Sequence, residues 1–91
     1  MLSIDLHLPV CRSLKQKRTA IKPILVGVRQ RFAVAAAEVD HQDRHQRARL
    51  GVAAVAASAG HVEDVLDEVE RFVWSRPDVE ILSADRSWVE T

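Results

Sequence analysis

The sequence has few of the residues on which disulfide-bonded, cofactor-bearing or membrane-embedded proteins depend. Its single cysteine, Cys11, excludes a disulfide or a cysteine metal cluster within these 91 residues. Three glycines without a Gly-x-Gly-x-x-Gly or Walker pattern argue against a nucleotide-phosphate loop. No apolar run approaches the roughly 20 residues of a membrane span, and Asp5 interrupts the N-terminal run, which predicts no signal peptide. We expect a cytoplasmic protein without a cofactor or a membrane partner.

Aromatic residues are also scarce, with two tryptophans, two phenylalanines and no tyrosine. RNA-recognition modules stack bases on aromatic side chains of a sheet. Because no aromatic residue falls in a predicted central strand, base-specific RNA readout of that type is disfavoured.

The charges are balanced in number but separated along the chain. Thirteen basic and thirteen acidic residues argue against nucleic-acid binding by bulk charge. However, residues 12–49 hold ten basic and three acidic residues, whereas residues 50–91 hold three and nine. Two interpretations stay open: the halves pair internally, or the basic half is exposed to RNA or an acidic partner.

The first half of the chain predicts a strand, a helix and a strand. Residues 2–8 alternate apolar and polar side chains, which is typical of a strand with one buried face. Ser13, with Gln16 three residues later, predicts a capped helix, and Pro23 inside this helix predicts a kink. Residues 33–40 are expected to form a short, alanine-rich strand. The expected inward stripe of the helix consists of Leu14, Ile21, Leu25, Val28 and Phe32.

The second half predicts a strand, a helix and a strand. Residues 46–58 are expected to pair with the preceding strand as a hairpin. A helix with an acidic outer face begins near Ser58 and ends before Pro77. Residues 79–84 alternate again and predict the final strand, with Trp88 in it or just past it.

The order β-α-β-β-α-β predicts an α+β fold in one domain over residues 1–91. The standard solution is a ferredoxin-like βαββαβ sandwich, with a four-stranded antiparallel sheet in the order 4-1-3-2 and two helices on one face. The other face is left uncovered, as a wet surface or a docking surface. Its expected polar side chains are Ser3, Asp5, His7, Arg47, Arg49 and Glu80.

The segment 38–45 is densest in functional groups. His41 and His45 are four residues apart, beside Asp40 and Asp43. On a helix this spacing could hold a metal, but in a predicted turn it imposes no common direction. We therefore expect a solvated turn and no metal ligands, and we identify no catalytic residues.

The start of the first helix offers two further possibilities. Cys11 precedes basic residues, which could lower its pKa, although we expect a passive, partly buried thiol. Arg12, Lys15 and free backbone N–H groups converge there and could bind an anion. The alternative is a solvated, basic helix end.

Two segments together resemble the YlxP-like family of small bacterial proteins of unknown function. The first is His7-Leu-Pro9 followed by Ser13-Leu-Lys-Gln-Lys-Arg18. The second is Ala37-Glu-Val-Asp-His-Gln-Asp43 followed by Gln46-Arg-Ala48 and Leu50-Gly-Val52. The resemblance covers roughly residues 2–85. Its matching polar positions are Ser13, Lys15, Lys17, Arg18, Glu38, Gln42, Asp43 and Arg47.

The resemblance implies a ferredoxin-like, bacterial, cytoplasmic protein that is often encoded beside translation and ribosome-maturation genes. It carries no established catalytic residues. The sequence departs from the family pattern at Pro23, in the alanine-rich second strand and at Arg44-His45, which affects local packing more than the family assignment.

Three functional hypotheses follow. The first is a non-enzymatic binding module for ribosomal RNA or a ribosomal particle. The second is a homo-oligomerising or protein-docking module, such as a dimer, that uses the open sheet face or the alanine-rich edge strand. The third is a small metal-dependent hydrolase built on the segment 38–45. In the first hypothesis the phosphate contacts are Arg12, Lys15, Lys17, Arg18 and Arg47.

Overall fold

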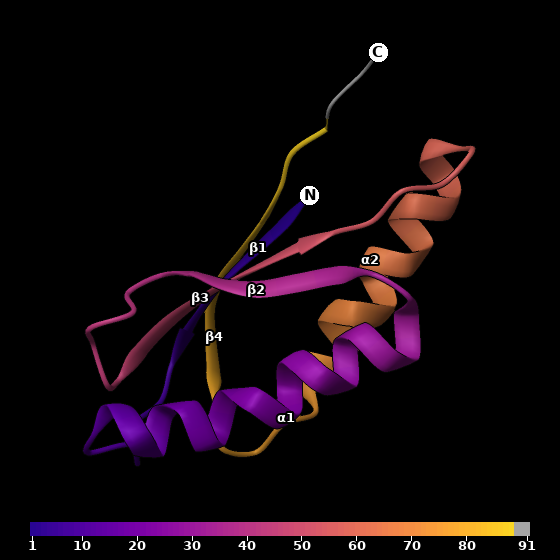
Figure 1. Cartoon of the computed structure of the whole chain (residues 1–91). Coiled ribbons are helices and arrows are strands. Elements are labelled where there is room, and N and C mark those ends of the chain that lie inside the picture. Colours follow the sequence, from indigo (N-terminus) through magenta and orange to yellow (C-terminus); the bar gives the residue numbers. More distant parts are fainter. Residues whose placement is uncertain (89–91) are drawn as a thin grey trace.

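The computed structural model describes residues 1–88, which form six regular elements. These elements are β1 (Leu2–His7), α1 (Leu14–Phe32), β2 (Ala35–Asp40), β3 (Arg47–Ala53), α2 (Ala59–Trp74) and β4 (Glu80–Arg86). The strands form one antiparallel sheet in the order β2-β3-β1-β4, with β1 and β3 in the centre (Figure 1). Counted from the β4 edge, the same neighbours read 4-1-3-2. This α+β arrangement is compatible with the expected ferredoxin-like fold.

The central strand β1 supplies the middle of the core. Leu2, Ile4 and Leu6 are fully buried, whereas the residues between them remain partly exposed. Burial of one such side chain contributes about 1.5–3 kcal/mol. Because the buried side chains of β1, α1 and α2 belong to one core, both helices pack on the same side of the sheet (Figure 1).

Helix α1 begins with the predicted cap. The Oγ of Ser13 accepts a hydrogen bond from the backbone N–H of Gln16 at 3.1 Å, and the Gln16 Oε1 accepts one from the N–H of Arg12 at 2.6 Å. The helix continues through Pro23 as one element and ends where Ala33 takes a left-handed conformation with φ of 52°. Side-chain caps of this kind stabilise a helix by about 1 kcal/mol.

The inward stripe of α1 differs from the expected one. Leu14, Leu25 and Phe32 are only partly buried, whereas Lys17 is buried. The four buried positions of the helix are Lys17, Ile21, Ile24 and Val28. The helix is therefore rotated slightly about its axis relative to the expected orientation, which brings Lys17 under the sheet.

The two helices meet where Gly27 faces the ring of Phe72. A Cβ atom at Gly27 would lie 2.6 Å from the Phe72 Cζ, so any larger residue here would require the ring or the helix to shift. The Phe72 ring also packs edge-to-face against Phe32, with 6.1 Å between centroids. The two helices run in different directions (Figure 1), and much of the surface of each helix is exposed to solvent.

The hairpin strands are shorter than expected. β2 begins at Ala35 because Val34 only connects it to the left-handed Ala33. β3 ends at Ala53, ahead of the loop to α2. On the open face, Val39 covers Gly51, where an added Cβ atom would lie 2.8 Å from the Val39 Cγ1.

The second helix and the last strand follow the sequence pattern. The Ser58 Oγ accepts a hydrogen bond from the N–H of His61 at 3.2 Å and caps α2, which ends before Pro77. Trp88 lies just past β4. Within residues 1–88, neither helix has both the length and the apolar character needed to cross a membrane.

Candidate polyanion-binding surface

Three of the predicted phosphate contacts lie exposed at the start of α1. Arg12, Lys15 and Arg18 are exposed, and no carboxylate of residues 1–88 lies within ion-pair distance of them. Helix α1 itself contains no acidic residue. Their positive charges are therefore available to a polyanion in solvent.

Lys17 corrects the prediction, because it is not available to a ligand. Only 1% of its side chain is exposed, and its Nζ lies 2.8 Å from the Glu38 Oε2. The ammonium also donates to the backbone oxygens of His41 at 2.7 Å, and of Gln42 and Arg47 at 3.3 Å each. A buried ammonium needs such partners, because an unpaired one would be strongly destabilising. Lys17 thus holds the β2–β3 turn against α1.

Arg47 also lies away from the other predicted contacts, on the open face of the sheet. Its Nη2 donates to the Asp5 Oδ2 at 2.7 Å. Asp5 lies 3.8 Å from the Nη1 of Arg49 and 3.7 Å from the Nε2 of His41, and on the same face the Nδ1 of His7 lies 3.1 Å from a carboxylate oxygen of Glu80. The Arg47 charge is largely neutralised by Asp5, so it does not extend the surface at the start of α1.

The acidic helix α2 does not neutralise α1. Its Asp67 and Glu70 pair with Arg86 of β4, at 2.7 Å and 3.2 Å. These contacts, with hydrogen bonds as the largest cause, raise the pKa of Arg86 above its ordinary value. Among the described residues, no basic side chain of α1 pairs with a carboxylate of α2. Among residues 1–88, the internal pairing of segments 12–49 and 50–91 is therefore limited to the contact of Arg49 with Asp85 at 3.9 Å.

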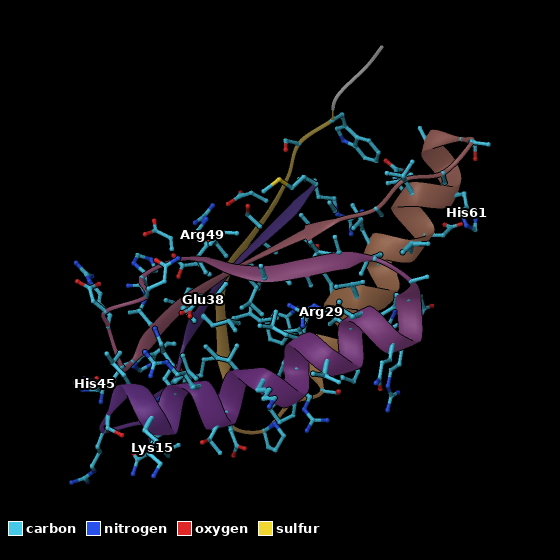
Figure 2. The ribbon with its side chains drawn as sticks, in the orientation of Figure 1. Lys15, Arg29, Glu38, His45, Arg49 and His61 are labelled. Atoms are coloured by element: carbon cyan, nitrogen blue, oxygen red, sulfur yellow. The ribbon has the colours of Figure 1, made fainter. Side chains whose placement is uncertain are left out.

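A groove of about 280 Å³ runs between α1 and the edge strand β2. Figure 2 shows Arg29 and Glu38 in the space between these elements, whereas Lys15 points away from the sheet. The Nε of Arg29 donates to the Ala36 carbonyl oxygen at 2.9 Å, and the Nη2 also donates to it. The groove is lined by Arg18, Ile21, Lys22, Leu25, Val26, Arg29 and Glu38.

A second, larger hollow lies at the other side of the α1 start and includes Cys11 and Lys15 in its lining. Burial, followed by the nearby Asp78 carboxylate, raises the pKa of the Cys11 thiol, although Lys17 opposes the shift. Cys11 is thus more buried than the partly buried thiol that we expected, and the basic residues at the helix start do not lower its pKa.

The functional side chains of segment 38–45 point in different directions. Glu38 points to the helix side, where it meets Lys17, and the His41 ring faces Asp5 on the open side. His45 is exposed at the turn. No group of three or more potential metal-binding side chains forms among residues 1–88. Nothing in this geometry supports the hydrolase hypothesis.

With this geometry established, comparison with known proteins identifies relatives. Residues 1–86 match the model of the family described as "Protein of unknown function (DUF503)". The chain belongs to this family. It is 38% identical over 76 residues to the "Uncharacterized protein YlxP" of Bacillus subtilis (strain 168), a match that covers 84% of this chain and 83% of the relative. The YlxP-like resemblance is thereby confirmed.

Some of the polar positions shared with the YlxP-like pattern have structural roles here. Ser13 caps α1, and Glu38 neutralises Lys17. The Nε2 of Gln42 makes a long contact of 3.5 Å with the Glu38 carbonyl oxygen, and Asp43 is exposed in the turn. Ser13, Glu38 and Gln42 thus shape the surface without forming part of its positive charge.

Lys22 and Arg29 lie beside these cations, although they are not among the phosphate contacts predicted from the sequence. A signal was present, because Arg18, Lys22 and Arg29 are spaced by four and seven residues, which puts them on one side of a helix. Their position beside β2 could not be known without the sheet topology.

Proposed function

We propose that this protein is a non-enzymatic, cytoplasmic binding module that contacts the phosphate backbone of RNA, with ribosomal RNA or a ribosomal particle as partner. The contacts are Arg12, Lys15 and Arg18. The observation that supports the proposal most directly is the absence of a carboxylate partner for these cations within residues 1–88, on a helix that has no acidic residue. Such contacts release counterions and therefore depend steeply on salt.

The test is fluorescence anisotropy with a labelled ribosomal RNA fragment, titrated between about 50 and about 200 mM salt. We expect binding that weakens with salt, and a slope that falls by about one for each phosphate contact removed. The Arg12→Gln/Lys15→Gln/Arg18→Gln variant should therefore lose most of the binding. Because these side chains are exposed, its thermal unfolding should match that of the wild type.

Arg71→Gln is the matched control, because Arg71 is exposed on α2 and pairs with Glu68 at 3.2 Å. Lys15→Gln, which removes the same single charge, should weaken RNA binding more than Arg71→Gln does. Equal losses would show that net charge alone governs the interaction. No RNA binding by the wild type at low salt would refute the proposal.

Self-association through the open sheet face is a second candidate function. Half-exposed Met1 and Val39 lie together over Gly51, so one part of this face is apolar. If two copies pair there, sedimentation equilibrium should detect a dimer that Val39→Asp weakens. A monomer at all concentrations would exclude this function.

A further inference from the structure

One flank of α1 carries a row of positive charge along the groove that separates it from β2. Arg18, Lys22 and Arg29 project from this flank and line the groove. Arg18 and Lys22 are exposed, and no carboxylate of residues 1–88 pairs with them. At 1.5 Å per residue, the row from Arg18 to Arg29 extends over about 16 Å.

Glu38 is the single carboxylate among the residues that line the groove. Its side chain is 19% exposed, and Lys17 lies behind it, 2.8 Å away and outside the groove lining. The two charges of this pair cancel, so the wall contributed by β2 does not repel an anion. The cations on α1 therefore make the electrostatic potential of the groove positive.

The occupant that fits this groove is a sugar–phosphate backbone. Phosphates complement the cations, and the apolar side chains of Ile21, Leu25 and Val26 offer a surface to the sugars. A peptide strand added to the β2 edge is a poorer fit, because Arg29 already occupies the Ala36 carbonyl with two N–H groups.

We propose that the RNA backbone continues from the start of α1 into this groove, where Lys22 and Arg29 are further phosphate contacts and Lys17 keeps the groove positive by neutralising Glu38. This inference rests on the proposed function and extends its site. Lys17 is a positioning residue in this scheme, because it acts through Glu38 and never touches the ligand.

The decisive experiment changes the charge of the Lys17–Glu38 pair in both directions and measures binding of the same ribosomal RNA fragment. Glu38→Gln removes the negative charge and should tighten binding by about three-fold. Lys17→Met leaves the Glu38 charge without its neutralising partner and should weaken binding by about three-fold. The double variant Lys17→Met/Glu38→Gln restores a neutral pair and should bind as the wild type does. A purely structural role would make all three variants weaker.

Substitutions at exposed positions test the groove without disturbing the fold. Lys22→Gln should weaken binding and lower the salt slope by about one, whereas Arg71→Gln on α2 should leave the slope nearly unchanged. Circular dichroism and thermal unfolding verify the fold of every variant.

The outcomes separate this inference from the proposed function. If the wild type binds RNA through the start of α1 but Glu38→Gln and Lys22→Gln change nothing, the groove inference is overturned and the proposed function stands. If the wild type binds no RNA, both fail. If Glu38→Gln tightens binding of a poly-glutamate peptide but not of RNA, the groove is a protein site and the inference is again overturned.

Discussion

The ammonium of Lys17 and the carboxylate of Glu38 lie 2.8 Å apart beneath the sheet, and this pair joins α1 to β2. The same ammonium donates to three backbone oxygens around the β2–β3 turn. One side chain thus connects the first helix, an edge strand and a turn that are separated by 21 to 30 residues in the sequence.

Removal of the Lys17 charge should destabilise the protein strongly. Lys17→Met leaves the Glu38 carboxylate without its partner, and the expected loss in free energy of unfolding is about 3 kcal/mol. Urea denaturation measures it. Lys17→Met/Glu38→Leu should recover part of the loss, because no unpaired charge remains. A double variant that is less stable than the single one would contradict this account.

Gly27→Ala should also destabilise the protein, although alanine favours a helix interior over glycine by about 0.5–1 kcal/mol. The new methyl group would meet Phe72 at 2.6 Å, and overpacking of this kind costs about 1–3 kcal/mol. Gly60→Ala is the control, because nothing lies within 4 Å of its added Cβ. Thermal unfolding of the two variants should shift in opposite directions or in clearly different amounts.

The carboxylates of Asp5 and Asp85 should contribute unequally to the stability of the protein. Asp5→Asn removes the negative charge that lies 2.7 Å from the Arg47 Nη2, and the expected loss in free energy of unfolding is about 1–3 kcal/mol. Asp85→Asn removes the charge of a side chain that is 71% exposed and lies 3.9 Å from Arg49, so the expected loss is below about 0.5 kcal/mol. Equal effects in urea denaturation would argue against a central role for Asp5.

The buried Cys11 should make stability sensitive to alkaline pH. Burial raises the pKa of this thiol above its ordinary 9.0, so the unfolded chain loses the proton more readily than the native protein. The contribution is fully present below pH 9.0 and is lost as the pH rises through the higher native pKa.

Alkylation and denaturation experiments measure this effect. Iodoacetamide should modify Cys11 slowly at neutral pH and faster once urea unfolds the chain. The alkaline loss of stability should be smaller in Cys11→Ala, which has no thiol. Rapid alkylation of the native protein would contradict the shift.

Local patterns were sufficient to predict most of the fold. The alternation in β1 and the caps Ser13 and Ser58 depend on neighbouring residues, so they can be read directly from the sequence. The ends of β2 and β3 were less predictable. Alanine has no strong preference for a strand, and the left-handed Ala33 that delays β2 has no distinctive side chain.

The site was only partly predictable, and Lys17 shows why. A lysine among other basic residues suggests a solvated helix face. Lys17 was therefore predicted to be exposed because it is charged, although its position in the helix indicates burial. Its spacing of three from Leu14 and four from Ile21 places it on the buried side. Its partner Glu38 lies opposite Leu50 in the hairpin, a register that depends on the sheet.

The hydrogen bond between Arg29 and the Ala36 carbonyl also affects how copies of the protein can associate through the edges of their sheets. A sheet grows by recruiting new strands along its free borders, and a guanidinium seated on one border blocks growth there. Two copies that joined through their β4 borders would each present to a third copy a β2 border whose Ala36 carbonyl is already occupied. Such a pair would therefore have one backbone acceptor fewer on each outer border with which to recruit a further strand.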